Sequence, residues 1–408
     1  MSPTRTATGP HVLRQINAAA VLDALRADPR TAIRVAALMA VTGLSRPAVM
    51  RAVSLLVDRG LAEYVDADPG EAPQLGRPAQ LVRFRSGQGF VAGIDVGPHK
   101  VLAMVADLAG EVRAELRTDL PEGATGPRVL DAVRATLRAV IRTAGISPDQ
   151  LWAVCVGSPG VVDRERGEVL VAPSIPGWAG LDVVPRLRMS LTCPVAIEND
   201  VNLAVRAEQW QGAATDTDTL VFVQWGERIG TGIVLGGQPH RGAHAAAGEL
   251  GFTDLTGDPD QPAAPVDTQM GPFERLVGAS AIRDLATAAY QRTGSGGWPG
   301  DNRDVAALVG AAAGGDPTAN EVVELVAARF AKGLANLLLI LDPGVVIVGG
   351  GISRAGETLL GPVRRHLRQR LLTPVDLRLS ELGERAVALG AVRHALDEVE
   401  TRLSPAAS

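Results

Sequence analysis

Two arginines near the amino terminus, Arg46 and Arg51, have a spacing that suits the recognition of DNA. On a helix they would share an outward face with Ala48, Met50 and Ser54, and Ser45 at the start of that helix is a further candidate for DNA contact. Guanidinium groups on such a face can bond either guanine edges or phosphate oxygens. The residue types leave that choice open, but both alternatives predict a DNA-binding face.

The elements that must position these arginines form a helix-turn-helix within residues 31–60. Thr31 is expected to cap the first of the two helices, whose apolar face includes Ile33, and Gly43 closes the turn that follows. Ser45 is expected to cap the second helix. That helix carries an apolar stripe at helical spacing: Val49, Val53, Leu56 and Val57. The stripe should face a core and leave the arginines in solvent.

The flanking sequence extends this unit to a winged helix. A supporting helix is predicted over residues 12–27, and strands are predicted over residues 61–65 and 80–84. The loop between the strands ends in Gly76-Arg77-Pro78, which resembles short arginine-centred elements that enter narrow A·T-rich minor grooves. The alternative interpretation is a plain helical bundle whose arginines are only solvated.

Charge is distributed unevenly along the chain. Residues 1–60 carry eight arginines and three aspartates, whereas the whole sequence of 408 residues has a formal net charge of −5. A basic head on an acidic body is typical of a DNA-binding unit joined to a sensor. No apolar run is long enough to span a membrane, and no signal-peptide pattern follows the first residues. The two cysteines, Cys155 and Cys193, lie in apolar stretches and predict buried thiols. We therefore expect a cytoplasmic protein with no membrane partner.

The rest of the chain carries a series of glycine-rich motifs behind a predicted hairpin over residues 90–107. In order, these motifs are VCVGSPGVVD (154–163), VAIENDVNLAV (195–205), WGERIGTGIVLGGQPHRGAHAAAGELG (225–251) and LDPGVVIVGGGIS (341–353). Together they resemble the ROK family of repressors, open reading frames and sugar kinases, over about residues 12–395. The END tripeptide, the RGAHAAAGELG run and the VGGGIS run are the most specific pieces.

The resemblance implies an α+β multidomain fold. A winged helix-turn-helix would occupy residues 1–86. A two-lobed α/β body of the actin-like ATPase or sugar-kinase type, which is ribonuclease H-like, would follow it. The first lobe would span residues 87–200 and be completed by a C-terminal helix at about 386–404, and the second lobe would span residues 201–385.

The resemblance also assigns a sugar pocket. Asp200 matches the family's general base, which accepts the proton of a sugar hydroxyl during phosphoryl transfer. The matched sugar-binding positions are Ser158, Pro159, Gly160, Asn199, Asp200, Glu249 and Glu274. Several acceptors in one cleft suit a polyol, which offers many O–H donors. The alternative for each acid is a solvated or helix-capping carboxylate.

The nucleotide loops are matched but altered. The matched positions are Asp95 and Gly97, Gly230, Thr231 and Gly232, and Gly349, Gly350 and Gly351. The phosphate turn has Pro98 and His99 where the kinases have glycine and threonine, and proline has no N–H to offer a phosphate. We therefore expect these loops to be vestigial, retained for turn geometry, with ATP binding lost.

The zinc site of the family is also missing from the sequence. Phe252 replaces a histidine that the family uses both for zinc and for the sugar, and no cysteine follows it in the next segment. Zinc requires thiolates or imidazoles in a tetrahedral array. The sequence predicts neither a metal nor a cofactor, and the ligand need not be an ordinary hexose.

These observations predict a sugar-responsive, DNA-binding regulator of carbohydrate genes, most simply a repressor. The resemblance implies a homodimer or homotetramer that reads a palindromic double-stranded operator. Two alternatives stay open: an active ATP-dependent sugar kinase with a regulatory head, and a structural protein that keeps the fold without a ligand. The sign of the ligand's effect on DNA binding does not follow from the sequence.

Overall fold

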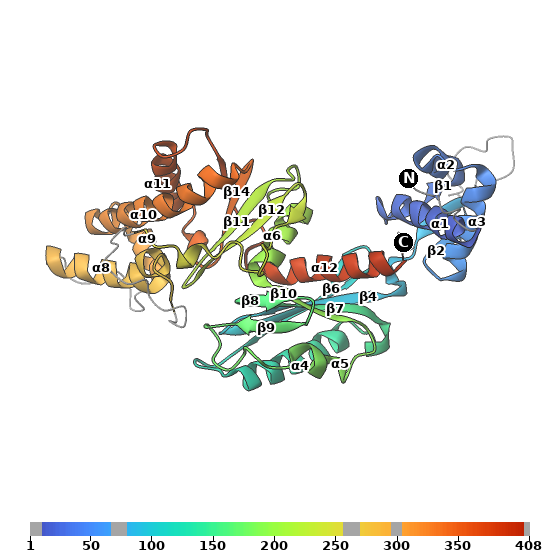
Figure 1. Cartoon of the computed structure of the whole chain (residues 1–408), viewed down its shortest axis with the longest axis horizontal. Coiled ribbons are helices and arrows are strands. Elements are labelled where there is room, and N and C mark those ends of the chain that lie inside the picture. The colour runs from blue at the N-terminus through green and yellow to red at the C-terminus, as the bar shows by residue number, and fades with distance from the viewer. Residues whose placement is uncertain (1–9, 67–79, 256–269, 295–303, 404–408) are drawn as a thin grey trace, which may run out of the picture.

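The computed structural model describes residues 10–66, 80–255, 270–294 and 304–403. It consists of a small N-terminal head and a larger body made of two α/β lobes (Figure 1). A long C-terminal helix runs through the body, and its end lies beside the head.

The head is a winged helix-turn-helix. Its elements are α1 (Pro10–Arg26), β1 (Ile33–Arg34), α2 (Val35–Thr42), α3 (Arg46–Asp58), β2 (Ala62–Val65) and β3 (Leu81–Phe84). The three strands form an antiparallel sheet in the order β1-β3-β2. Its core holds fully buried side chains from the helices and the sheet, among them Leu25, Leu38, Val53 and Val82.

The start of the second helix differs from the prediction. Helix α2 begins at Val35 with Arg34 as its N-cap, so Thr31 does not cap it. Ile33 instead lies in β1, where it pairs with Val82 of β3. A strand of two residues is too short to show a periodicity of its own, and its backbone partners are about fifty residues away along the chain.

The first lobe is built on a five-stranded sheet in the order β10-β7-β4-β5-β6. Its elements are β4 (Phe90–Val96), β5 (Lys100–Asp107), β6 (Val112–Asp119), α4 (Gly126–Thr143), β7 (Leu151–Ser158), α5 (Val183–Arg188) and β10 (Val195–Asn199), with a small pair β8 (Val161–Asp163) and β9 (Glu168–Val171). Helices α4 and α5 cover one face of the sheet, and α12 (Ala386–Leu403) covers the other (Figure 1). The predicted hairpin over residues 90–107 is the antiparallel pair β4 and β5.

The second lobe has a five-stranded sheet in the order β13-β12-β11-β14-β15. Its elements are α6 (Asp200–Gln211), β11 (Leu220–Trp225), β12 (Ile229–Leu235), β13 (Gln238–Pro239), α7 (Glu274–Val277), α8 (Ala279–Thr293), α9 (Val305–Ala313), α10 (Pro317–Leu341), β14 (Val345–Gly349), α11 (Glu357–Arg368) and β15 (Asp376–Leu379). Helix α6 packs on one face of this sheet, and the later helices pack on the other.

Helices α6 and α12 pack against each other between the two sheets (Figure 1). One continuous apolar cluster includes side chains of the head, of α12, of α6 and of both sheets, for example Leu25, Met104, Leu203 and Val392. In the described residues no single helix is both long and apolar enough to cross a membrane. Helices α2 and α3 reach the necessary length and apolar content only when they are taken together, and the pair is bent by 107°.

Candidate DNA-binding and ligand-binding sites

Helix α3 has the geometry of a recognition helix. Helices α2 and α3 meet at 107°, within the range of helix-turn-helix units. Gly43 ends α2 with φ +67°, and its N–H donates to the Met39 carbonyl at 2.9 Å. A left-handed conformation at this position suits glycine, which explains why the turn can be so tight.

The predicted outward face of α3 is only partly correct. Ser45, Arg46, Arg51 and Ser54 are exposed. Ala48, however, is buried, and Met50 is half-buried against the core of the head. The buried side of α3 includes Ala48 and Ala52 beside the predicted stripe, so it is wider than the stripe alone. Small side chains on this helix therefore serve packing, and the polar ones are left for a partner.

Ser45 stands at the N-terminus of α3, as predicted, but its hydroxyl makes no capping hydrogen bond. Its carbonyl instead accepts from the N–H groups of Ala48 and Val49 at 2.9 and 3.0 Å. The exposed hydroxyl therefore lies at the positive end of the helix dipole, a favourable place for a phosphate. Gly76, Arg77 and Pro78 of the predicted wing lie outside the described residues.

A cavity of about 90 Å³, lined by both polar and apolar groups, lies between the two lobes. Its lining residues come from both lobes: Pro159, Gly160, Pro173, Ser174, Asn199, Asp200 and Val201, with Gln224, Arg228, Ile229, Gly230, Glu249, Phe252 and Glu274. The fold thus brings six of the seven predicted sugar-binding residues to one cavity. Closure of the lobes would change its shape directly, because each lobe supplies one wall.

Asp200 is placed at the N-terminus of α6, where β10 ends. The N–H of Val201 and the amide of Asn199 donate to its Oδ1, at 2.9 and 3.2 Å. Burial raises its pKa to about 7, with further contributions from the charges of Asp95 and Glu249 that outweigh the backbone hydrogen bonds. A carboxyl group that titrates near neutral pH can accept a proton from a ligand hydroxyl.

Asn199 and Ser158 mainly hold the walls of the cavity. Asn199 caps α6 by accepting from the N–H of Asn202, and its amide donates to the Gly160 carbonyl at 2.8 Å. Ser158 does not line the cavity, contrary to the prediction. Its hydroxyl is fully buried and accepts from Trp178 Nε1 at 2.9 Å. An indole N–H buried in the core requires an acceptor, and the Ser158 hydroxyl provides it.

The two glutamates differ in their surroundings. Glu249 lines the cavity, and burial raises its pKa, with a further contribution from the charge of Glu274. Glu274 is 2% exposed and already accepts from the N–H groups of Ile229 and Gly271, at 2.9 and 2.7 Å. It also contacts Arg228 at 3.4 Å. Its carboxylate therefore fixes the β11–β12 turn and Arg228, and Glu249 has more capacity left for a ligand.

The phosphate turn between β4 and β5 is closed by its own residues. The Gly97 N–H donates to the Lys100 carbonyl at 2.9 Å. Lys100 Nζ lies 3.2 Å from Asp95 and 3.7 Å from Glu384. Burial raises the pKa of Asp95, and the charge of Lys100 opposes that rise. Two carboxylates share the one lysine, and Pro98 offers no N–H, so the turn presents little to attract a phosphate.

Gly232, Gly349 and Gly350 are required for packing, whereas a Cβ on Gly97 or Gly351 would meet no atom closer than 3.6 Å. A Cβ on Gly232 would lie 2.3 Å from the Val201 carbonyl of α6. A Cβ on Gly350, which has φ +87°, would lie 2.5 Å from the Trp225 carbonyl, and one on Gly349 would lie 2.5 Å from the Phe222 ring. A Cβ on Gly230 would lie 3.0 Å from Val201 Cγ1. Thr231 is buried, and its hydroxyl donates to the Gly248 carbonyl at 2.5 Å.

No group of three or more His, Cys, Asp or Glu side chains has the arrangement of a metal site in the described ranges, which exclude residues 256–269. Phe252 is half-buried and lines the cavity at the position where the family places a histidine. It offers an aromatic face there in place of a ligand for a cation.

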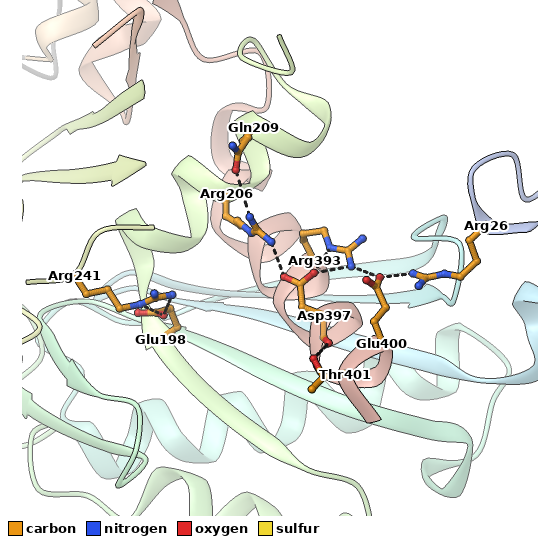
Figure 2. A network of polar contacts seen from close by, with 9 residues as sticks. All are labelled: Arg26, Glu198, Arg206, Gln209, Arg241, Arg393, Asp397, Glu400 and Thr401. Atoms are coloured by element: carbon orange, nitrogen blue, oxygen red, sulfur yellow. Dashed lines mark hydrogen bonds and ion pairs between the residues drawn. The ribbon is translucent and has the colours of Figure 1, made fainter. Parts of the chain in front are cut away.

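A polar network, which no sequence pattern predicted, joins the body to the head. Glu400 of α12 binds Arg26 of α1 and Arg393, and Arg393 binds Asp397 at 2.7 Å (Figure 2). Asp397 in turn binds Arg206 of α6 at 2.9 Å. The spacing of Arg393, Asp397 and Glu400 on one helix face was a usable signal, but nothing in the sequence revealed the contact with Arg26.

Comparison with known proteins places these features in a family. A model of the ROK family matches residues 91–398, and a model of the MarR family matches residues 14–71. The chain is 24% identical over 356 residues to a xylose repressor of Caldicellulosiruptor bescii, which covers 85% of this chain and 88% of that protein. It is 34% identical over 248 residues to a glucokinase of Thermotoga maritima, or 58% of this chain and 77% of the kinase.

A solved structure shows the same fold from end to end. It is that of a ROK family transcriptional regulator, a homologue of the E.coli MLC protein, with a TM-score of 0.77 and 24% identity. The match covers 96% of this chain and 99% of that one. The winged head and the two-lobed body therefore occur together in both proteins.

Proposed function

Because this chain belongs to the ROK family, we propose that it is a DNA-binding transcriptional repressor whose affinity for its operator is set by a sugar. The observation that carries this proposal is the union, in one chain, of an exposed arginine-bearing recognition helix and a carboxylate-lined cavity between two lobes. The relative named as a xylose repressor matches 85% of this chain, which is more than residues 91–398 of the ROK body.

The head would bind double-stranded DNA through α3. Arg46 and Arg51 would reach base edges or phosphates in the major groove, while the Ser45 hydroxyl would meet a phosphate at the start of the helix. The segment Gly76-Arg77-Pro78 would enter the adjacent minor groove. The basic charge of the first sixty residues favours approach to DNA, in spite of the acidic body.

The cavity would bind a free sugar. Asp200 and Glu249 offer carboxylate oxygens to hydroxyl donors, and Asn199, Pro159 and Gly160 shape the wall beside Asp200. Phe252 would stack on the apolar face of the ring, where a family histidine would bond a hydroxyl. Carboxylates repel anions, so we expect a free sugar to bind better than its phosphate.

We further propose that the protein works without ATP, zinc or phosphoryl transfer. The phosphate turn lacks the backbone donor that Pro98 removes, and Lys100 is already engaged with Asp95 and Glu384. The packing of Gly232, Gly349 and Gly350 explains why the glycines persist without a nucleotide. In this arrangement Asp200 acts as a hydrogen-bond acceptor for the sugar and not as a catalytic base.

One observation favours a second candidate, an ATP-dependent sugar kinase with a regulatory head. Asp200 keeps the position and the raised pKa that suit a general base. The glucokinase relative is 34% identical over 248 residues.

Two measurements separate these functions. Fluorescence anisotropy with the DNA upstream of the protein's own gene should show salt-sensitive binding that changes when the effector sugar is added. The effector is found by a thermal-shift screen of pentoses, hexoses and amino sugars. A coupled assay for ADP release over the same panel should show no turnover. Turnover that Asp200→Asn abolishes would establish the kinase instead.

The assembly belongs to the same proposal. A homodimer or homotetramer would place two heads on the half-sites of a palindromic operator. Sedimentation velocity of the full chain, with a footprint of the bound DNA, tests this directly. A monomer with a single protected half-site would contradict it.

A further inference from the structure

A second cavity, which is polar and has a volume of about 220 Å³, lies along α6 at Asn202, Leu203 and Arg206, whereas the sugar cavity meets this helix at Asp200 and Val201. It is bounded by α6, α12, the β13 edge and the turn between β8 and β9. The side chains that matter are Arg164, Glu198, Asn202, Arg206, Arg241 and His394. None of its described lining residues also lines the first cavity.

Three guanidinium groups face this cavity, and two buried or half-buried carboxylates hold them. Glu198, which is 2% exposed, accepts from Arg241 Nε at 2.8 Å and lies 3.3 Å from Arg164 Nε (Figure 2 shows the Arg241 contact). Arg206 binds Asp397 at 2.9 Å. A guanidinium has five N–H donors, so one carboxylate between Arg164 and Arg241 leaves donors of both for an oxyanion.

Asn202 provides an independent sign of a ligand. It is 6% exposed and lines the cavity, and its amide donates to Glu198 at 3.3 Å. Its Oδ1 atom is buried without a hydrogen-bond partner among the described residues. A buried acceptor without a donor destabilises the folded protein, so such atoms usually have a partner in the functional state. The atom is not open to the cavity as it stands, so a rotation of the Asn202 side chain, which lines the cavity, would bring it to a hydroxyl group of a ligand.

The other groups in the wall limit the charge of the ligand. Glu398 and Asp397 add two negative charges, which offset the arginines. Burial lowers the pKa of His394, and the charge of Arg164 adds to this, so its imidazole stays neutral at neutral pH. The cavity therefore lacks the cationic excess that a ligand with several anionic groups requires, and its volume fits a ligand of roughly ten heavy atoms or fewer.

We propose that this cavity is a second ligand site, which binds a small hydroxylated oxyanion. Arg164 and Arg241 hold its carboxylate or phosphate group, and one of its hydroxyl groups donates to Asn202 Oδ1. The site is separate from the sugar cavity, and it contacts Asp397 of the network that leads to Arg26 of the head.

Calorimetric titration of the full chain tests the site with glycerol 3-phosphate and glycerate as the two hydroxylated oxyanions, and with inorganic phosphate and glycerol as single-group probes. At least one of the first two should bind, and the tighter one identifies phosphate or carboxylate as the preferred group. Inorganic phosphate, which brings no carbon-borne hydroxyl to Asn202, should bind roughly tenfold more weakly than glycerol 3-phosphate if phosphate is preferred. Glycerol should not bind.

The variants compare two arginines of the same turn. Arg164→Gln should weaken binding of the preferred oxyanion roughly tenfold. Arg166→Gln is the matched control, because Arg166 is 74% exposed and pairs only with Asp163 among the described residues. Asp200→Asn should leave oxyanion binding unchanged, which separates this site from the proposed sugar site. The proposal is overturned if neither oxyanion binds, if both arginine variants behave alike, or if Asp200→Asn abolishes the binding.

Discussion

Asp200 combines a position at a helix N-terminus with an environment that resists its ionisation. The helix start and the Val201 N–H favour the carboxylate, but burial and the neighbouring acids Asp95 and Glu249 favour the neutral acid. The balance puts its pKa at about 7. At neutral pH the residue therefore changes between an acceptor and a donor, and a sugar hydroxyl would select the carboxylate as its acceptor.

This balance predicts a pH-dependent cost to folding. Since the pKa is about 7 in the folded protein and near 3.8 in the unfolded chain, the folded state binds more protons between these values. The contribution of Asp200 to the free energy of unfolding therefore falls as pH rises from about 4 to about 7. Asp200→Asn removes it, so the variant should gain on the order of 2 kcal/mol over the wild type between about pH 5 and about pH 8.

Urea unfolding followed by tryptophan fluorescence measures this difference, because all five tryptophans lie in the body. The comparison between variant and wild type cancels the titration of Asp95 and Glu249 to a first approximation. Parallel pH profiles for the two proteins would show that Asp200 titrates as an ordinary exposed carboxylate.

Arg51 leads to a prediction about DNA affinity. It is exposed in the middle of α3. If Arg51 contacts a base, Arg51→Ala should weaken operator binding by about 1–3 kcal/mol and relax the sequence specificity. If Arg51 contacts a phosphate, the variant should weaken binding to all DNA sequences alike and lower the slope of affinity against salt concentration by about 1. Arg138→Ala on α4 removes the same charge from an exposed position of the body and should leave binding unchanged. Anisotropy at several salt concentrations distinguishes the two modes, and equal affinities for the two variants would remove α3 from the interface.

At the scale of elements, the contact between α6 and β12 depends on glycine. Gly232 lets the helix backbone approach the strand, and the helix start at Asp200 is thereby held against the β11–β12 turn at Arg228. The geometry of the sugar cavity is thus set by a packing contact beneath it. If Gly232 is retained for this packing contact, its replacement should destabilise the protein. If it is retained only to bind a nucleotide, its replacement should leave the stability unchanged.

Gly232→Ala should therefore destabilise the body by about 1–3 kcal/mol, because its Cβ would lie 2.3 Å from the Val201 carbonyl and 2.9 Å from Val205 Cβ. Gly310→Ala in α9 is the matched control, since no heavy atom lies within 4 Å of its Cβ position. That change should stabilise the helix by about 0.5–1 kcal/mol. Thermal unfolding of both variants decides the matter, and an unaffected Gly232→Ala protein would argue that the glycine was kept for another purpose.

The sequence predicted the elements with strong local signals and failed where a partner is distant. Helix α3, the hairpin β4–β5 and the pocket acids were found because helical spacing, alternation and the END motif are local patterns. Strand β1 was missed because two residues carry no period. Ser158 was misplaced because the indole that engages its hydroxyl, Trp178, is twenty residues further along the chain. Glu274 had two interpretations in the sequence, and only the packed turn shows how much of its carboxylate is already bonded.

At the scale of the whole molecule, α12 connects the body to the head. It contacts α6, which lines both cavities, and it also contacts the head. Its Asp397 binds Arg206 of α6, and its Glu400 binds Arg26 of α1 (Figure 2). Burial raises the pKa of Glu400, but its hydrogen bond with Arg26 and the charge of Arg393 outweigh this, so the pKa is lowered. Glu400 is therefore ionised at neutral pH. Any shift of α6 against α12 on ligand binding would change the contact that holds the head.

Glu400→Gln should therefore uncouple the head from the sugar. The variant removes the charge that binds Arg26 and Arg393. The ratio of operator affinities with and without sugar should therefore fall at least fivefold toward one. Binding of the sugar alone and of the operator alone should persist. Glu321→Gln is the control, because Glu321 of α10 forms an exposed pair with Arg292 of α8. Both helices lie at the opposite end of the molecule from the head (Figure 1). Anisotropy titrations of operator DNA at zero and saturating sugar give the ratio for each protein. A ratio unchanged in Glu400→Gln would mean that the lobes reach the DNA by another route, through the apolar cluster that α12 shares with the head.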